Sequence, residues 1–225
     1  MKNLIKFITV CICLIVAANG YAASLNITGP DVTASSAAYI YYGGSGWTYG
    51  TNQDFFPGHW NNPGTMRAFA EFNLQSWYDL GLPSSAISSI TFSAKYTGAE
   101  NASDVSLYYM TNDEDGTVNT GDYNAGVTYI TTFSLAQYNP YLTSDVTPYI
   151  LPDIDATQQW SGLSLRLAVE SGYSVVYFGG ESYPNDQQPI LTIEYNEPVT
   201  VPEPLTLILT AISVLGLASR KMKKS

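Results

Sequence analysis

The chain has 225 residues, is 45% hydrophobic and only 12% charged, and carries a formal net charge of −10. This length suits one domain with additional segments at its ends. The acidic charge argues against a nucleic-acid binder, which needs a basic surface to displace counterions from phosphates. The 18 glycines, 12 prolines and 18 tyrosines exclude a helical bundle, and 13% aromatic residues exclude a disordered acidic tail.

The charges are distributed unevenly along the chain. Most basic residues lie at the two ends, and only Arg67, Lys95 and Arg166 lie between them. Residues 24–200 hold 18 acidic residues against 3 basic ones. We expect such a surface to prefer neutral partners, or to meet anionic ones through a bridging cation.

Residues 1–22 have the parts of a secretory signal peptide. Lys2 and Lys6 precede an apolar run over 7–18, and small residues stand at the −3 and −1 positions of a cut after Ala22. The alternative is an uncleaved membrane anchor, which the short apolar run disfavours. The sequence therefore predicts export through the Sec translocon.

Both cysteines of the chain, Cys11 and Cys13, lie inside this apolar run. Cleavage after Ala22 would leave a mature chain without thiols. We therefore expect the domain to be held by packing alone, without disulfides or thiolate chemistry.

Residues 24–198 are predicted to form one all-β domain. Short alternating runs recur between clusters of Gly, Asn, Asp and Pro, as half-buried strands do. The clearest runs are 90–96, 105–109, 163–169 and 191–195. The positions expected to face the core are Ile90, Phe92, Ala94 and Tyr96, then Val105, Leu107 and Tyr109, then Leu163, Leu165, Leu167 and Val169. Strands of this kind indicate a sandwich or a barrel, and we predict a two-sheet, jelly-roll-like β-sandwich.

Aromatic residues in polar stretches give the best functional hint. Tyr42, Trp47, Tyr49 and Trp60 lie among glycines, asparagines and other polar residues. A flat ring offers a sugar an apolar platform, while neighbouring polar groups bond its hydroxyls. We predict these four residues as glycan-binding, although aromatic residues of a sandwich commonly pack in its core.

An acidic loop over 111–122 has the spacing of a calcium loop at some positions. Asp113, Asp115 and Asp122 fall at the third, fifth and twelfth places of an EF-hand loop, and Gly116 at the sixth. No helices are predicted on either side. Calcium is the one cofactor that this loop suggests, and the alternative is a solvated hairpin loop.

Little in the sequence favours catalysis. The single histidine, His59, lies in a stretch with the composition of a loop, and no nucleophile elbow or HExxH motif occurs. Glycosidases need two carboxylates, for which Glu71 and Glu181 are the least loop-like candidates. Because the chain has many acidic residues, finding such a pair says little about catalysis. We predict a protein that is not an enzyme.

The C-terminal segment 201–225 has three parts. A Val-Pro-Glu-Pro motif at 201–204 precedes an apolar stretch at 205–219 and a basic cluster at 220–224. The stretch is short for a bilayer, but flanking basic residues can snorkel and the bilayer can thin. We predict a single membrane helix with its basic cluster held in the cytoplasm by the positive-inside rule.

This tail resembles the PEP-CTERM sorting signal of Gram-negative bacteria, with Pro202, Glu203 and Pro204 as its motif. The resemblance implies recognition by an exosortase, a membrane transpeptidase-like enzyme. It also implies a precursor held transiently in the inner membrane, followed by sorting to the cell surface or the extracellular matrix. The alternative is a plain C-terminal anchor after a proline-rich linker.

The middle of the chain resembles DNRLRE-type (CBM96-like) carbohydrate-binding domains. The segments that carry the resemblance are 39–51, Arg67–Leu74, Leu82–Ile90, Asp145–Thr147, Trp160 with Gly162, Glu181, and Pro189–Tyr195. Asn73 stands where the family has Asp. The resemblance implies a β-sandwich that binds carbohydrate.

Together these features predict an exported, non-catalytic surface or matrix protein that binds extracellular polysaccharide. One alternative is a structural or adhesive surface protein with no specific glycan ligand. A polysaccharide-degrading enzyme is the other alternative.

Overall fold

The computed structural model describes residues 22–28, 37–43, 46–51, 54–60, 64–101, 104–111, 116, 122–124, 127–135, 140–179 and 188–197. For residues 28, 37–43, 46–51, 54, 60 and 124 it describes the backbone only. Contacts divide the chain into a compact unit, Ala22–Asn196, and a second unit that combines Met1–Tyr21 with Glu197–Ser225.

The predicted terminal signals lie almost wholly outside the described residues. This holds for the signal peptide up to Tyr21, for Pro202, Glu203 and Pro204, for the helix at 205–219 and for the basic cluster at 220–224. Among the residues that the structure does describe, no helix has the length and hydropathy needed to cross a membrane.

The unit is built mainly of strands. They are β1 (Ala22–Thr28), β2 (Ala37–Gly43), β3 (Gly46–Thr51), β4 (Asp54–Phe55), β5 (Gly58–Trp60), β6 (Gly64–Asn73), β7 (Ile87–Glu100), β8 (Val105–Met110), β9 (Val127–Phe133), β10 (Tyr141–Asp145), β11 (Trp160–Leu167), β12 (Ser174–Gly179) and β13 (Ile190–Asn196). Among the described residues the helical elements are α2 (Gln75–Tyr78), α3 (Thr147–Asp155) and two 3₁₀ turns, η1 (Ser84–Ala86) and η2 (Asp122–Asn124). The predicted all-β class is confirmed.

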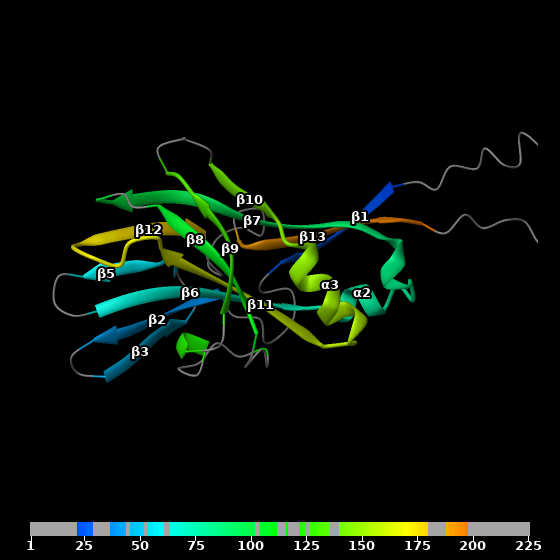
Figure 1. The fold of residues 1–225 in the computed structure, drawn as a ribbon, viewed down its shortest axis with the longest axis horizontal. Helices are drawn as coiled ribbons and strands as arrows, with labels where there is room; N and C mark the ends of the chain where they lie inside the picture. The colour runs from blue at the N-terminus through cyan, green and yellow to red at the C-terminus, as the bar shows by residue number, and fades with distance from the viewer. Residues whose placement is uncertain are drawn as a thin grey trace, which may run out of the picture. The chain divides into compact units, whose positions relative to one another are not determined.

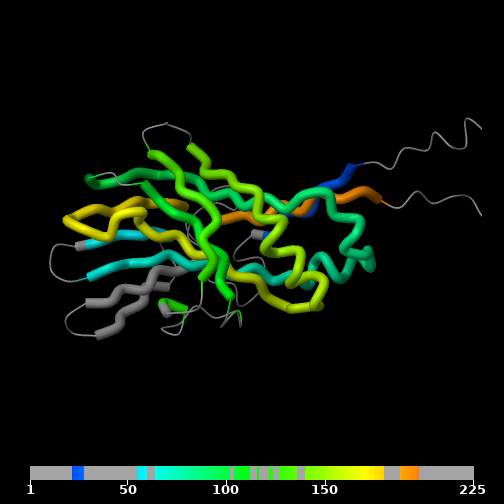
Figure 2. Tube along the Cα trace, viewed as in Figure 1, coloured from blue at the N-terminus to red at the C-terminus, as the bar shows by residue number. Residues whose placement is uncertain are grey.

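Strand β7 connects the hydrogen-bonded network. Its first part pairs with β13 and β10, and its last part pairs with β12, all antiparallel. The path of paired strands runs β1-β13-β7-β12-β5-β6-β11-β8-β9, with β2 and β3 added beside β6. Figures 1 and 2 show β7 as a long strand that runs along the unit beside β10 and β12.

One hydrophobic cluster joins these strands to the two helices. It contains Phe72 of β6, Phe92 of β7, Trp77 of α2 and Ile150 of α3, among others. The rings of Phe72 and Phe92 meet edge to face, with centroids 6.3 Å apart. Such aromatic pairs add to the stabilisation that burial alone provides.

The predicted core faces are confirmed in most positions. The predicted positions from Ile90 to Leu167 belong to the core cluster or pack against it. Val169 is the exception, since β11 ends at Leu167 and Val169 is 61% exposed. The prediction for Val169 is therefore wrong: β11 ends where its partner β8 begins, at Val105 opposite Leu167.

The unit has a helix end, where α2 and α3 lie, and a loop end, where β5 meets β12 (Figure 1). Strand β6 begins at the loop end opposite β5 and finishes at the helix end, where Asn73 pairs with Trp160. Ala22 of β1 lies opposite Asn196 of β13, whose neighbour Tyr195 lies opposite Ile87. The first and last strands of the unit thus reach the helix end together.

Candidate functional site

Alternation along two paired strands leaves one face of the sheet directed away from the core. The core cluster takes Ala68, Ala70 and Phe72 from β6, and Leu163, Leu165 and Leu167 from β11. The intervening residues point to the opposite side because successive strand side chains alternate. We call this side of β6, β11 and the strands paired with them the outer face. It carries Arg67 and Arg166.

Register brings the two arginines together on the outer face. The pairing of β6 with β11, continued by one residue beyond Leu165, places Arg67 opposite Arg166. On the other side of β11, Arg166 lies opposite Ser106 of β8, which lies opposite Thr132 of β9. The Oγ atom of Ser106 and the Oγ1 atom of Thr132 are 2.8 Å apart. A polar row therefore crosses four strands.

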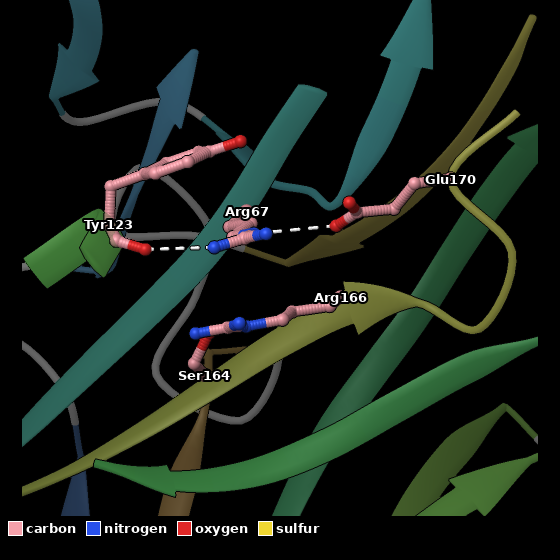
Figure 3. A network of polar contacts seen from close by, with 5 residues as sticks. All are labelled: Arg67, Tyr123, Ser164, Arg166 and Glu170. Carbon is pink, nitrogen blue, oxygen red and sulfur yellow. Dashed lines mark hydrogen bonds and ion pairs between the residues drawn. The ribbon is translucent and has the colours of Figure 1, made fainter. Parts of the chain in front are cut away.

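Arg67 is held by groups on both sides of its guanidinium. Its Nη1 donates a 2.8 Å hydrogen bond to the carbonyl oxygen of Tyr123, and its Nε pairs with Oε1 of Glu170 at 3.3 Å (Figure 3). The guanidinium carbon also lies 4.2 Å from the centroid of the Tyr123 ring. These contacts anchor the 3₁₀ turn η2 to β6 and neutralise one of the two arginines.

Arg166 has weaker contacts than Arg67. Its Nε lies 3.5 Å from Oγ of Ser164, at the long limit of a hydrogen bond. Its guanidinium carbon lies 4.9 Å from the centroid of the Tyr108 ring. Burial, and next the positive charge of Arg67, lower the pKa of Arg166 to about 10, so the guanidinium stays charged at neutral pH.

Two tyrosine rings continue from Arg166 toward solvent. Tyr108 of β8 lies opposite Tyr129 of β9, and their rings meet edge to face with centroids 5.7 Å apart. Tyr129 is 53% exposed, which is unusual for so large a ring, whereas Tyr108 is partly buried. The hydroxyl of Tyr129 lies 3.1 Å from Oγ1 of Thr132. Aromatic rings (Tyr108 and Tyr129), hydroxyl groups and the guanidinium of Arg166 thus lie close together on the outer face.

Backbone register also relates the four predicted glycan-binding residues to this face. Tyr42 of β2 lies opposite both Trp47 of β3 and Thr65 of β6. Tyr49 lies opposite Ile40, whose other partner is Arg67. Residues directly opposite in a pair belong to one face, so positions 42, 47 and 49 belong to the outer face.

Trp60, the fourth predicted residue, ends β5 opposite Gly64 at the loop end. Only the backbone is described for these four residues. Their role in binding glycan therefore stays a prediction.

The predicted calcium loop falls mostly outside the description. Asp113 and Asp115 are not among the described residues, and Asp122 is a fully buried residue of η2. Within the described part of the chain, no three His, Cys, Asp or Glu side chains are grouped to hold a metal ion. Calcium binding by this loop stays a prediction.

Glu71 has a structural environment, fully buried on the outer face of β6. Its Oε2 accepts a 2.5 Å hydrogen bond from the backbone N–H of Gly116. Gly116 has φ +86° and lies against Trp160, whose ring would be 2.4 Å from a Cβ at that position. Glu71 thus anchors this loop to the sheet. Glu181, its predicted catalytic companion, lies outside the described residues.

The prediction of His59 as a loop residue is wrong. His59 lies in β5, opposite Ser174 and Thr65, and its Nδ1 is 2.6 Å from the carbonyl oxygen of Gly172. The strand is three residues long and forms by pairing on both sides. A contact of this kind gives the imidazole a structural role at the loop end.

Two further residues at the loop end share one carboxylate. Glu100 accepts hydrogen bonds from the hydroxyl of Tyr173 at 2.5 Å and from that of Tyr177 at 3.1 Å. The bond to Glu100, more than burial, raises the pKa of the Tyr173 hydroxyl. The carboxylate thereby ties β7 to β12.

Sequence reasoning missed the juxtaposition of Arg67 with Arg166 and the roles of Tyr108, Tyr123 and Tyr129. Alternation indicates that Arg166 faces outward, but only register reveals its neighbour. A scan of protein-family models and a search of curated proteins both find no match to this chain.

Proposed function

We propose that this protein is an exported, non-catalytic surface or matrix protein that binds extracellular polysaccharide on the outer face. The observation that carries the proposal is the exposed Tyr129 ring, packed on Tyr108 and flanked by the hydroxyl of Thr132. A sugar presents an apolar ring face and polar edges, and this arrangement matches both.

The proposal includes the two-sheet, jelly-roll-like sandwich. Two groups of strands share β7: one contains β1, β13 and β10, and the other contains β5, β6, β11, β8 and β9. Packing of Phe72 on Phe92 across the core supports this division, because each ring comes from a different group. In such a sandwich the outer face lies on the side of its sheet away from the core. Part of it is buried, as at Glu71, whereas Tyr129 is exposed and open to a ligand.

The proposal also includes export by the Sec translocon and sorting by an exosortase. In this account both predicted signals hold the precursor in the inner membrane of a Gram-negative bacterium. The sequence features that support it are the apolar run after Lys2 and Lys6, and the Pro-Glu-Pro motif followed by an apolar stretch and a basic cluster. A cut after Ala22 would leave all but one residue of β1 in place.

The test measures retention of the purified full-length protein in native gels that contain polysaccharide. The panel comprises dextran, glucomannan, carboxymethyl dextran and dextran sulfate, each with and without calcium. We expect Tyr129→Ala to weaken retention by at least about fivefold, since loss of a stacking ring costs on the order of 1 kcal/mol or more. Tyr141→Ala is the control, because Tyr141 is a 36% exposed tyrosine of β10.

Failure of the wild-type protein to bind any of the four polymers, in either condition, would contradict glycan binding. The structural or adhesive alternative would then be favoured. Release of reducing sugar from the same incubations would instead favour the enzyme.

A further inference from the structure

Among the described residues, the two arginines of the outer face share a single ion-paired carboxylate, that of Glu170. Arg67 pairs with Glu170, but Arg166 makes no ion pair within the part of the chain that the structure describes. These are two of only three basic residues between the predicted terminal signals. In a segment dominated by acids, two of its three basic residues are therefore adjacent, and among the described residues only Arg67 of these two makes an ion pair.

Arg166 also has unused hydrogen-bonding capacity. A guanidinium has five N–H donors. The Arg166 Nε makes one long contact with Ser164, and the buried Nη2 has no hydrogen-bond partner among the residues that the structure describes. A buried donor without a partner is costly, and a partly buried charge without a counterion is more so. A fold without use for this guanidinium would gain stability by placing a neutral side chain here.

Arg166 can be approached from the tyrosine pair. The side chain keeps part of its surface exposed. Its guanidinium lies over Tyr108, which packs on the exposed Tyr129. A ligand stacked on Tyr129 and extending along β11 would therefore bring its substituents to Arg166. The Arg67 guanidinium opposite adds a second positive charge to the potential at that point.

We propose that Arg166 binds an oxyanion group, a carboxylate or a sulfate ester, carried by the polysaccharide that the outer face binds. The inference rests on the proposed function and names its ligand class. It changes the expectation drawn from net charge, because a local pair of arginines would bind an anionic sugar without a bridging calcium ion. Arg67, whose Nη1 and Nε contact Tyr123 and Glu170, is a positioning residue that holds η2 in place.

The test uses three polymers with one backbone: dextran, carboxymethyl dextran and dextran sulfate. The full-length protein is compared with Arg166→Gln, Arg166→Lys and Lys95→Gln, in EDTA. Lys95→Gln is the matched control because it removes the third basic residue of the domain, on β7, and changes net charge by the same amount. Thermal unfolding of each variant checks its fold.

We expect the wild-type protein to bind one or both charged dextrans more tightly than dextran. Arg166→Gln should lower that affinity by about tenfold or more, as loss of a charged hydrogen-bonding partner does. Arg166→Gln should change the affinity for neutral dextran by less than about twofold. Lys95→Gln should change the affinity for each of the three polymers by less than about twofold. Arg166→Lys should retain part of the affinity, because it keeps the charge but loses the planar fork.

Several results would overturn the inference. Equal losses in Arg166→Gln and Lys95→Gln would show a net-charge effect only. Preference for neutral dextran, or binding to charged dextran that EDTA abolishes, would refute direct binding while leaving glycan binding intact. Failure to bind any polymer would overturn the proposed function as well. If Arg166→Gln fails to fold, an Arg166→Lys variant that binds with unchanged affinity would refute a role for the guanidinium.

Discussion

The hydroxyl of Tyr109 donates a 2.6 Å hydrogen bond to the carboxylate of Asp153, and so joins strand β8 to helix α3. Oδ2 of the same carboxylate accepts a 2.5 Å bond from Oγ of Ser161 in β11. Asp153 is almost fully buried. A buried carboxylate is tolerated where donors satisfy it, and these two bonds fix the helix against the sheet.

Removal of the Tyr109 hydroxyl tests this attachment. We expect Tyr109→Phe to lower the free energy of unfolding by about 1–2 kcal/mol, because it leaves a buried carboxylate oxygen with one donor fewer. Tyr149→Phe on α3 is the control. Its ring packs beside Tyr109, and its hydroxyl makes no hydrogen bond among the described residues, so the change should be below about 0.5 kcal/mol. Equal losses in urea unfolding would contradict the assignment.

The pH dependence of stability should report Asp153. Burial raises the pKa of its carboxyl, although the bonds from Ser161 and Tyr109 oppose the rise. Below the unfolded pKa, about 3.9, both states carry the proton and ionisation costs nothing. As pH rises from there through the raised folded pKa, the unfolded chain ionises first. The contribution of this group to stability therefore falls.

The measurement compares wild type with Asp153→Asn in urea between about pH 3 and pH 7. The stability of wild type relative to the variant should decrease as pH rises. Asp155→Asn, at an exposed position of the same helix, is the control for an Asp-to-Asn change on α3. If wild type instead becomes more stable relative to Asp153→Asn as pH rises, the hydrogen bonds from Ser161 and Tyr109 lower the pKa of Asp153 more than burial raises it.

Helix α3 ends with backbone strain at Thr157. This residue has φ +55°, in the left-handed region that a β-branched side chain adopts at a cost of about 1–2 kcal/mol. We expect Thr157→Gly to raise the free energy of unfolding by about 0.5–1 kcal/mol, after the added flexibility of the unfolded chain is counted. Asn101→Gly, at φ +49°, should change stability little because Asn tolerates this region. A loss of stability in Thr157→Gly would refute the strain.

Gly116 fits a place where no side chain can. Its positive φ and the ring of Trp160 both oppose a Cβ atom. Gly116→Ala should destabilise the protein by about 2–4 kcal/mol, since strain and overpacking add. Gly98→Ala is the control, because an added Cβ there meets nothing within 4 Å. Thermal unfolding that moves equally in both variants would contradict the close approach to Trp160.

The sequence predicts long strands better than short ones. Alternation in 90–96 and 163–167 predicts faces that the structure confirms, because each strand has one side in the core. No such local period exists for His59, since β5 depends on partners far away in the chain. The structure gives Asn73 a role: its Oδ1 accepts a 2.8 Å hydrogen bond from the backbone N–H of Gln75. An Asp at this position could accept the same bond.

The candidate site was harder to predict because it depends on register. Arg67 and Arg166 are far apart in the sequence and are visible there only as two of three basic residues. Nothing local indicates that β6 pairs with β11 in the register that joins them. Net charge alone favours neutral ligands, whereas the local arrangement of Arg166 and Tyr108 favours an anionic one.

The most direct test of this account is the affinity of the full-length protein for carboxymethyl dextran in EDTA, measured for wild type and for the double variant Tyr129→Ala, Arg166→Gln. The exposed Tyr129 ring and the Arg166 guanidinium, which makes no ion pair among the described residues, predict clear retention of wild type and loss of retention in the folded double variant. Equal retention of the two proteins, or no retention of wild type, would contradict it.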